Sequence, residues 1–226
     1  MIISVILLVI VAAVAYFASN EGAWGAALIF LSVLFSGLLA MNFFEPLAAA
    51  LDGSMGKHAD FVALMGLFIV SVLLMRLFAD YLAPTQIELP GLVYDIGRFG
   101  FGAAAGYITM AFMLTAVHTA PVPREFLDFT PERMNLFDVH APDRAWLGFT
   151  QHVSEKMMGS KVVFDGPKYK MPGMSQPNAW PSFTIRYAAR REAAAGRPAG
   201  AAGPTMNAGP AANDQPATKP PSGGGF

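Results

Sequence analysis

Two pairs of opposite charges are the residues of this chain whose types and spacing could do chemistry. Arg76 and Asp80 are four residues apart, and Asp95 and Arg98 are three apart, so each pair would share one face of a helix. Ionisable side chains within a membrane span are costly and by default mark an ion or substrate pathway. Long arginine side chains near the end of a span can instead reach water. We therefore expect interfacial ion pairs, with a polar pathway through all four residues as the alternative.

The histidines form no recognisable metal or catalytic motif. The chain has four of them, scattered along its length, and none has the HExxH spacing of a zinc site. It has no cysteine, which excludes disulfides and thiolate-bound metals. The motifs GxSxG and GxxxxGK[ST] are absent from the sequence. We expect no metal, no cofactor and no enzymatic activity, and a membrane enzyme using His140 or His152 is the least favoured alternative.

The composition places these residues in a membrane protein. The chain is 54% hydrophobic and 14% charged, whereas a soluble domain is usually about one quarter charged. Residues 1–120 carry three basic and seven acidic side chains, and the remainder carries twelve basic and nine acidic ones. The chain is therefore expected to have an apolar membrane half and a polar half.

The apolar half predicts four membrane spans. A span needs about 20 apolar residues, and residues 1–44, if they formed one helix, would extend for about 66 Å. The chain must therefore turn near Ser19–Gly22, which holds the only charge of that stretch. The predicted fold is an all-α membrane protein with a four-helix transmembrane bundle over 1–120. Its spans are expected at about 1–18, 23–44, 61–83 and 99–120, and a cleaved signal peptide is the alternative for the first.

Glycines in the fourth span predict close helix packing. Gly102 and Gly106 form a GxxxG motif, and Gly97 extends the small face toward the start of the span. Without side chains at these positions another helix backbone can approach closely enough for van der Waals contact to hold the pair in lipid. The motif predicts helix association and implies no catalysis.

The polar region, residues 121–192, contains one predicted amphipathic helix, at about 143–158. Trp146, Phe149, Val153 and Met157 recur at helical spacing and draw one apolar stripe. This stripe could lie in the membrane interface with Trp146 at headgroup depth, or it could pack on the four-helix bundle. We favour packing on the bundle.

Basic residues and a low-complexity tail follow. Arg186, Arg190 and Arg191 lie among aromatic residues, and an anionic lipid surface would attract them, although a solvated helix end would have the same pattern. Residues 193–226 are mostly Ala, Gly and Pro. Such a segment cannot bury enough apolar surface to offset its ordering entropy, so we expect a disordered tail.

Three features resemble the colicin V production protein (CvpA) family of bacterial inner-membrane proteins. They are a helix hairpin with a very short turn at Ser19–Gly25, a third helix that ends in a polar connection, and a fourth helix opening with Asp95, Arg98 and glycines four apart. The resemblance covers about residues 1–120. It implies a multi-pass, non-enzymatic protein of the bacterial inner membrane, linked to colicin V production, a toxin biosynthetic process, and to envelope integrity.

The expected partners follow from this assignment. We expect contact with the lipid bilayer, association with a second copy or with another membrane protein, and no nucleic acid. The alternative function is a small transporter or channel subunit whose polar route is lined by Arg76, Asp80, Asp95 and Arg98.

Overall fold

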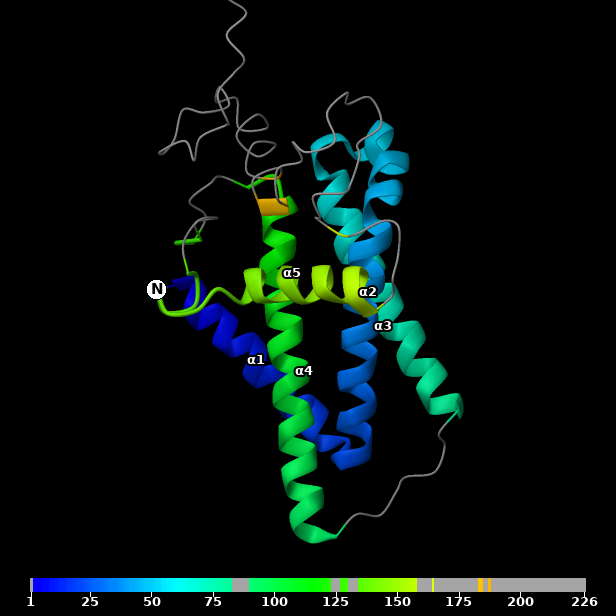
Figure 1. Ribbon diagram of the computed structural model, residues 1–226, viewed down its shortest axis with the longest axis vertical. Helices are drawn as coiled ribbons and strands as arrows, with labels where there is room; N and C mark the ends of the chain where they lie inside the picture. Colours follow the sequence, from blue (N-terminus) through cyan, green and yellow to red (C-terminus); the bar gives the residue numbers. More distant parts are fainter. Residues whose placement is uncertain are drawn as a thin grey trace, which may run out of the picture.

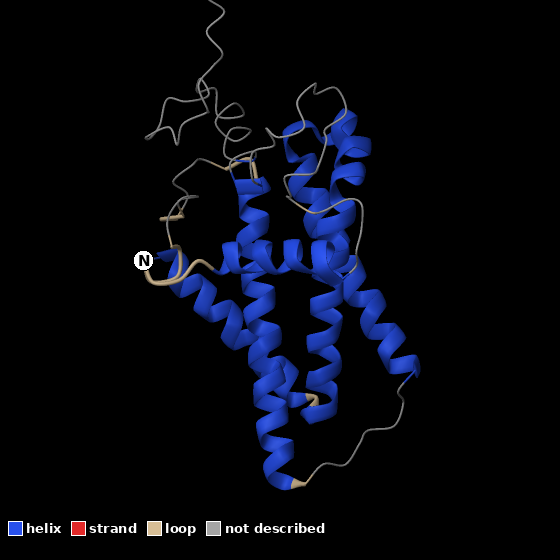
Figure 2. Cartoon of the chain, viewed as in Figure 1, coloured by secondary structure: helices blue, strands red, loops and turns tan. Residues whose placement is uncertain are grey.

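The computed structural model shows an all-helical protein. It describes residues 2–82, 90–122, 127–129, 134–157, 164, 183–184 and 187. These residues form helices and no β-strand (Figure 2), and an isolated antiparallel bridge joins Leu136 to His140. The predicted all-α fold class is therefore confirmed for the described part of the chain. The predicted disordered tail, 193–226, lies outside it.

Four long helices form a bundle (Figure 1). They are α1 (Ile2–Asn20), α2 (Gly22–Met55), α3 (Ala59–Leu82) and α4 (Gly91–Thr119), with a short 3-10 helix, η1 (Gly56–His58), between α2 and α3. Helix α1 packs on α4, α4 packs on α2, and α2 packs on α3. Only Glu21 separates α1 from α2. The next residue, Gly22, has a φ of +78°, a conformation that glycine adopts without a steric penalty.

Three helical stretches are long and apolar enough to cross a membrane. They are Ile2–Asn20, Gly22–Leu82 and Gly91–Thr119. The second contains α2, η1 and α3, and α3 runs back alongside α2 (Figure 1). The predicted count of four spans is thus matched roughly, since two of the four helices belong to one continuous apolar stretch.

Two helices are longer than the predicted spans. Helix α2 continues through Pro46 to Met55 instead of ending near residue 44. A proline removes one backbone hydrogen bond, but the following Leu-Ala-Ala-Ala-Leu run favours helix strongly, and Ala48 is buried in the core. Helix α4 begins at Gly91, directly after Pro90, whose carbonyl accepts a 2.8 Å hydrogen bond from the Tyr94 amide.

A shorter helix lies across the bundle. It is α5 (Pro142–His152), which continues into a π-helical turn, η2 (Val153–Met157), at the place of the predicted amphipathic helix. Figure 1 shows α5 in front of α4 and α2 and crossing them, and α5 packs on α4.

The core has two parts. One lies between α1 and α4 and contains Ile3, Leu7, Met110, Leu114 and Phe129. The larger one joins α2, α3, α4 and α5, and its centre is a stacked pair, Phe68 and Phe112, with ring centroids 4.1 Å apart. Phe183 and Tyr187, from the predicted polar region, are buried in this larger core beside Phe44. The polar region therefore contributes side chains to the helical core.

Candidate functional site

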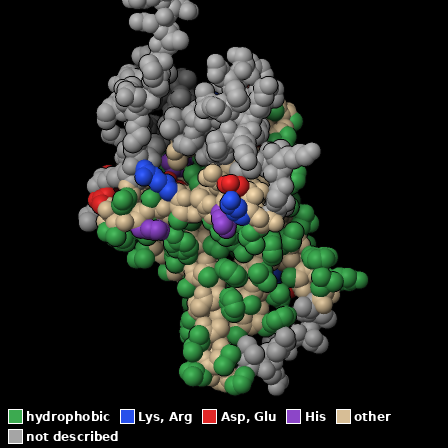
Figure 3. Space-filling view, viewed as in Figure 1, with side chains coloured by type: hydrophobic (Ala, Val, Ile, Leu, Met, Phe, Trp, Pro, Cys, Tyr) green, Lys and Arg blue, Asp and Glu red, His purple; other side chains and the backbone are tan. Residues whose placement is uncertain are grey.

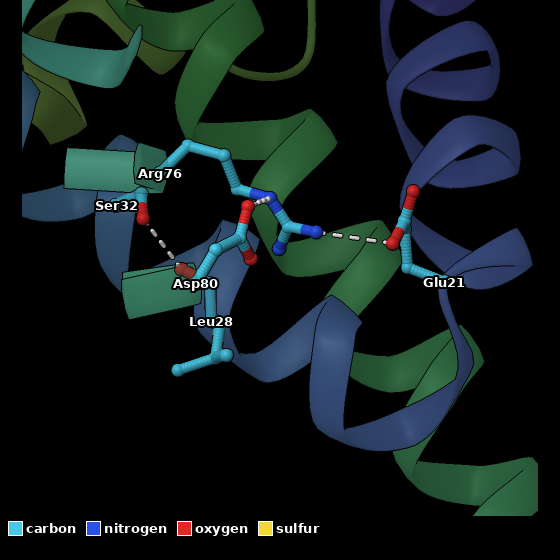
Figure 4. A network of polar contacts seen from close by, with 5 residues as sticks. All are labelled: Glu21, Leu28, Ser32, Arg76 and Asp80. Carbon is cyan, nitrogen blue, oxygen red and sulfur yellow. Dashed lines mark hydrogen bonds and ion pairs between the residues drawn. The ribbon is translucent and has the colours of Figure 1, made fainter. Parts of the chain in front are cut away.

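A charged network lies where α1 and α2 meet, facing α3 (Figure 4). Arg76 Nη2 donates a 3.0 Å hydrogen bond to Glu21 Oε2, and Arg76 Nε lies 3.4 Å from Asp80 Oδ2. Beside this network, the Ser32 hydroxyl donates to the Leu28 carbonyl within α2 (Figure 4). The carboxylate of Glu21 stands at the N-terminus of α2, where the helix dipole favours negative charge. Arg76 thus ties α3 to the turn between α1 and α2.

Glu21 is a member of this network that the sequence analysis missed. It is 55 residues from Arg76, and local spacing along a helix could not have linked the two. The available signal was its position as the only charge in the first 44 residues. Because the Glu21 and Asp80 side chains are half exposed, each pair contributes at most about 1 kcal/mol in water.

The second predicted pair forms separately at the start of α4. Arg98 Nη2 lies 3.0 Å from Asp95 Oδ1, and the guanidinium is 5.4 Å from the Tyr94 ring centroid and 4.6 Å from that of Phe99. These distances permit cation–π attraction as well as the ion pair. Among the described residues no ion pair joins this pair to Arg76 or Asp80.

The glycines of α4 face α1. A Cβ atom at Gly102 would lie 2.9 Å from the Ala15 carbonyl oxygen, and one at Gly106 would lie 2.6 Å from the Val11 carbonyl oxygen. At Gly97 a Cβ would meet a side chain of α2 at 3.1 Å. Real Cβ atoms do not approach backbone oxygen this closely, so α1 and α4 can be in contact here only because both positions are glycine.

The tryptophan of α5 is buried, which corrects its predicted contact with the membrane surface. Trp146 is 4% exposed, and its ring lies edge-on to Phe112 with centroids 6.1 Å apart. A Cβ at Gly37 would be 2.7 Å from Trp146 Cζ2, so the indole fills the space that this glycine leaves on α2. Of the apolar stripe, Trp146 and Val153 are buried, whereas Phe149 and Met157 are 38% and 73% exposed. The other predicted surface contacts, Arg186, Arg190 and Arg191, lie outside the described residues.

A buried hydrogen bond joins α5 to α4. His118 Nε2, in the last turn of α4, lies 2.9 Å from Asp143 Oδ2, in the first turn of α5, and both side chains are 0% exposed. The Phe129 and Phe183 rings lie edge-on to the imidazole at 5.0 and 6.4 Å. Within the described structure His118 Nδ1 and Asp143 Oδ1 have no hydrogen-bond partner.

The sequence analysis missed this pair because its members are 25 residues apart. A signal was present, since His118 is the one histidine of the run 99–123, which has no Asp, Glu, Lys or Arg, and a buried polar group needs a partner. The segment before α5 is also linked to α4, by the 2.8 Å hydrogen bond between Tyr107 Oη and His140 Nε2. Among the described residues no three potential metal ligands gather.

The family comparison covers the helices that build these sites. The family model described as colicin V production protein matches residues 3–132, more than half of the chain. The match includes the charged network, the Gly102–Gly106 contact and His118, and it ends before α5. No curated protein and no solved structure matches the chain. By this match and by its apolar helices, the chain belongs to the colicin V production protein family of membrane proteins.

Proposed function

We propose that this protein is a multi-pass protein of the bacterial inner membrane that works as a non-enzymatic scaffold in colicin V production and in envelope integrity. The observation that carries the proposal is the backbone contact of α1 with Gly102 and Gly106 of α4. Helices in lipid gain nothing by hiding apolar surface from their surroundings, so they associate through close contacts of this kind. The close contact of α1 with Gly102 and Gly106 is therefore of the kind that holds helices together in lipid.

The distance between the polar ends of the helices supports a bilayer placement. Twenty residues separate Arg98 from His118 on α4, which is about 30 Å of helix. Sixteen residues separate Glu21 from Gly37, the contact of α5 on α2, which is about 24 Å. The hydrocarbon core of a bilayer is about 30 Å thick. The charged network would then lie at one face of the membrane and α5 at the other.

The surface between these two levels supports the same placement. Large apolar side chains are exposed along α1, α3 and the first half of α4, among them Phe17, Leu73, Leu74 and Phe99. In Figure 3 the surface below α5 is predominantly hydrophobic, and charged and histidine side chains gather at the level of α5. Such a surface suits contact with lipid tails.

A substitution in the glycine contact tests the proposal. The variant Gly102→Leu with Gly106→Leu places side chains against the α1 backbone and should lower the protein level in membranes. It should also fail to restore colicin V release and detergent resistance in a bacterium lacking its own family member. Gly100→Leu is the matched control, because nothing lies within 4 Å of a Cβ at that position. Equal protein levels and full restoration by the double variant would contradict the proposal.

A small transporter or channel subunit is the second candidate function. Arg76 Nη1 and Arg98 Nε are shielded from solvent and, among the described residues, have no hydrogen-bond acceptor. Unsatisfied buried donors are uncommon, and an anionic solute passing the charged end of the bundle would supply the missing acceptors.

A further inference from the structure

Five large apolar side chains stand exposed on α5, η2 and the segment that leads into α5. Met134 is 47% exposed, Phe137 49%, Val139 78%, Phe149 38% and Met157 73%. They belong to residues 134–157, which otherwise carry a polar outer surface. In Figure 3 the level of α5 lies directly above a predominantly hydrophobic surface.

The segment before α5 is fixed to the first turns of α1. Ser4 Oγ donates a 3.1 Å hydrogen bond to the Asn135 carbonyl and accepts a 3.1 Å hydrogen bond from the Phe137 amide. Figure 1 shows the segment beside the start of α1 and continuing into α5. Since α1 is an apolar helix of membrane-spanning length, its first turn lies close to one face of the bilayer. The segment and α5 share that level.

Two buried contacts fix which face of α5 points outward. The His118–Asp143 pair holds the first turn of α5 on α4, and one turn later the Trp146 indole packs against Gly37 of α2. The outer side of α5 and η2 then carries Phe149 together with four exposed polar residues, namely Arg144, His152, Glu155 and Lys156. A helix that lies along the bilayer plane with mixed apolar and charged residues outside is typical of the headgroup region.

We propose that residues 134–157 form an interfacial belt that contacts the lipid headgroup region through Phe137, Val139, Phe149 and Met157. The inference rests on the bilayer placement proposed above. Its occupant is lipid because α5 lies directly above the predominantly hydrophobic surface of the spans in Figure 3, so that apolar side chains at this level are next to the lipid around the spans. The exposed formal charges of the belt, Asp138, Arg144, Glu155 and Lys156, balance, so contact comes from apolar insertion and not from attraction to anionic lipid.

Single cysteines can measure this depth, since the chain has no native cysteine. The full-length variants Val139→Cys and Met157→Cys, each carrying a nitroxide, are reconstituted into phosphatidylcholine vesicles. For each label we compare the collision rate of the nitroxide with oxygen, which concentrates in lipid, and its collision rate with a water-soluble nickel chelate. The oxygen-to-nickel ratio of these two rates reports the depth of the label. Ile69→Cys, exposed on α3 seven residues before Arg76, serves as the lipid reference, and Ser54→Cys, exposed at the end of α2, serves as the aqueous one. Circular dichroism checks that each variant keeps its helices.

The expected oxygen-to-nickel ratio at Val139 and Met157 lies between the two references and does not change when phosphatidylglycerol is added. A ratio equal to that at Ser54, with Ile69 deep in lipid, would overturn the belt while leaving the bilayer placement intact. A water-accessible Ile69 would overturn the placement and the belt together. If the labels at Val139 and Met157 are shielded from both reagents, another protein surface covers these side chains. If the oxygen-to-nickel ratio rises when anionic lipid is added, charge attraction holds the belt at the membrane. Either result would overturn the proposal.

Discussion

Removing one member of the buried His118–Asp143 pair should release α5 from the bundle. Both side chains are 0% exposed and their polar atoms are 2.9 Å apart, so either single replacement leaves a buried polar group without its partner. Leaving one buried hydrogen-bonding group unsatisfied costs about 1–3 kcal/mol. Replacing both partners by apolar groups of the same shape can be nearly neutral or stabilising. We therefore expect His118→Leu and Asp143→Leu each to weaken the docking of α5, and the double variant to recover most of the loss.

A cysteine at Thr150 reports this docking. Thr150 is 1% exposed on α5, and Thr150→Cys is close to it in size, so thiol labelling occurs only when α5 opens. A loss of about 1–3 kcal/mol raises the labelling rate about 5- to 150-fold, up to the limit set by a fully exposed thiol. His152→Leu, on the exposed face of the same helix, is the matched control and should stay within about twofold of the parent, since surface changes cost at most about 0.5 kcal/mol.

Two results would refute this reasoning. If either single variant labels at the parent rate, the His118–Asp143 hydrogen bond does not hold α5. If the double variant labels as fast as the single ones, the lost stability comes from side-chain volume and not from an unpaired polar group. The double-mutant cycle thereby separates the hydrogen bond from packing at this contact.

Three further predictions concern the rest of the bundle. Gly37→Ala places a methyl group 2.7 Å from the buried indole ring of α5 and should cost about 1–3 kcal/mol in thermal unfolding in detergent, whereas Gly66→Ala, with nothing within 4 Å, should be neutral or stabilising. Glu21→Gln breaks a half-exposed ion pair and should cost at most about 1 kcal/mol, with a smaller effect in high salt; a larger loss would mean that the network is shielded from solvent. Arg76→Gln with Asp80→Asn should abolish solute flux in reconstituted vesicles if the protein is a transporter, and unchanged flux, or none in the parent, would remove that function.

Local sequence patterns predicted the helices and missed some of their boundaries. The apolar runs and the turn near Ser19–Gly22 correspond to α1 through α4, because hydropathy and turn residues act over a few neighbouring positions. Helix α2 passes Pro46 because α3 covers that stretch, with Ala63 and Leu64 fully buried in the shared core. Tertiary contact there outweighs the local helix-breaking signal, and the sequence pattern holds no information about that contact.

The sequence alone determined that this chain is an apolar helical protein, with glycines four apart and ion pairs at helix spacing. Lipid and water act on each side chain separately, so these properties are local. The tertiary structure alone decided that Arg76 meets Glu21, that His118 meets Asp143 and that Trp146 fills the space at Gly37. These partners are 25 to 109 residues apart, and they meet only because of how the helices turn back and cross.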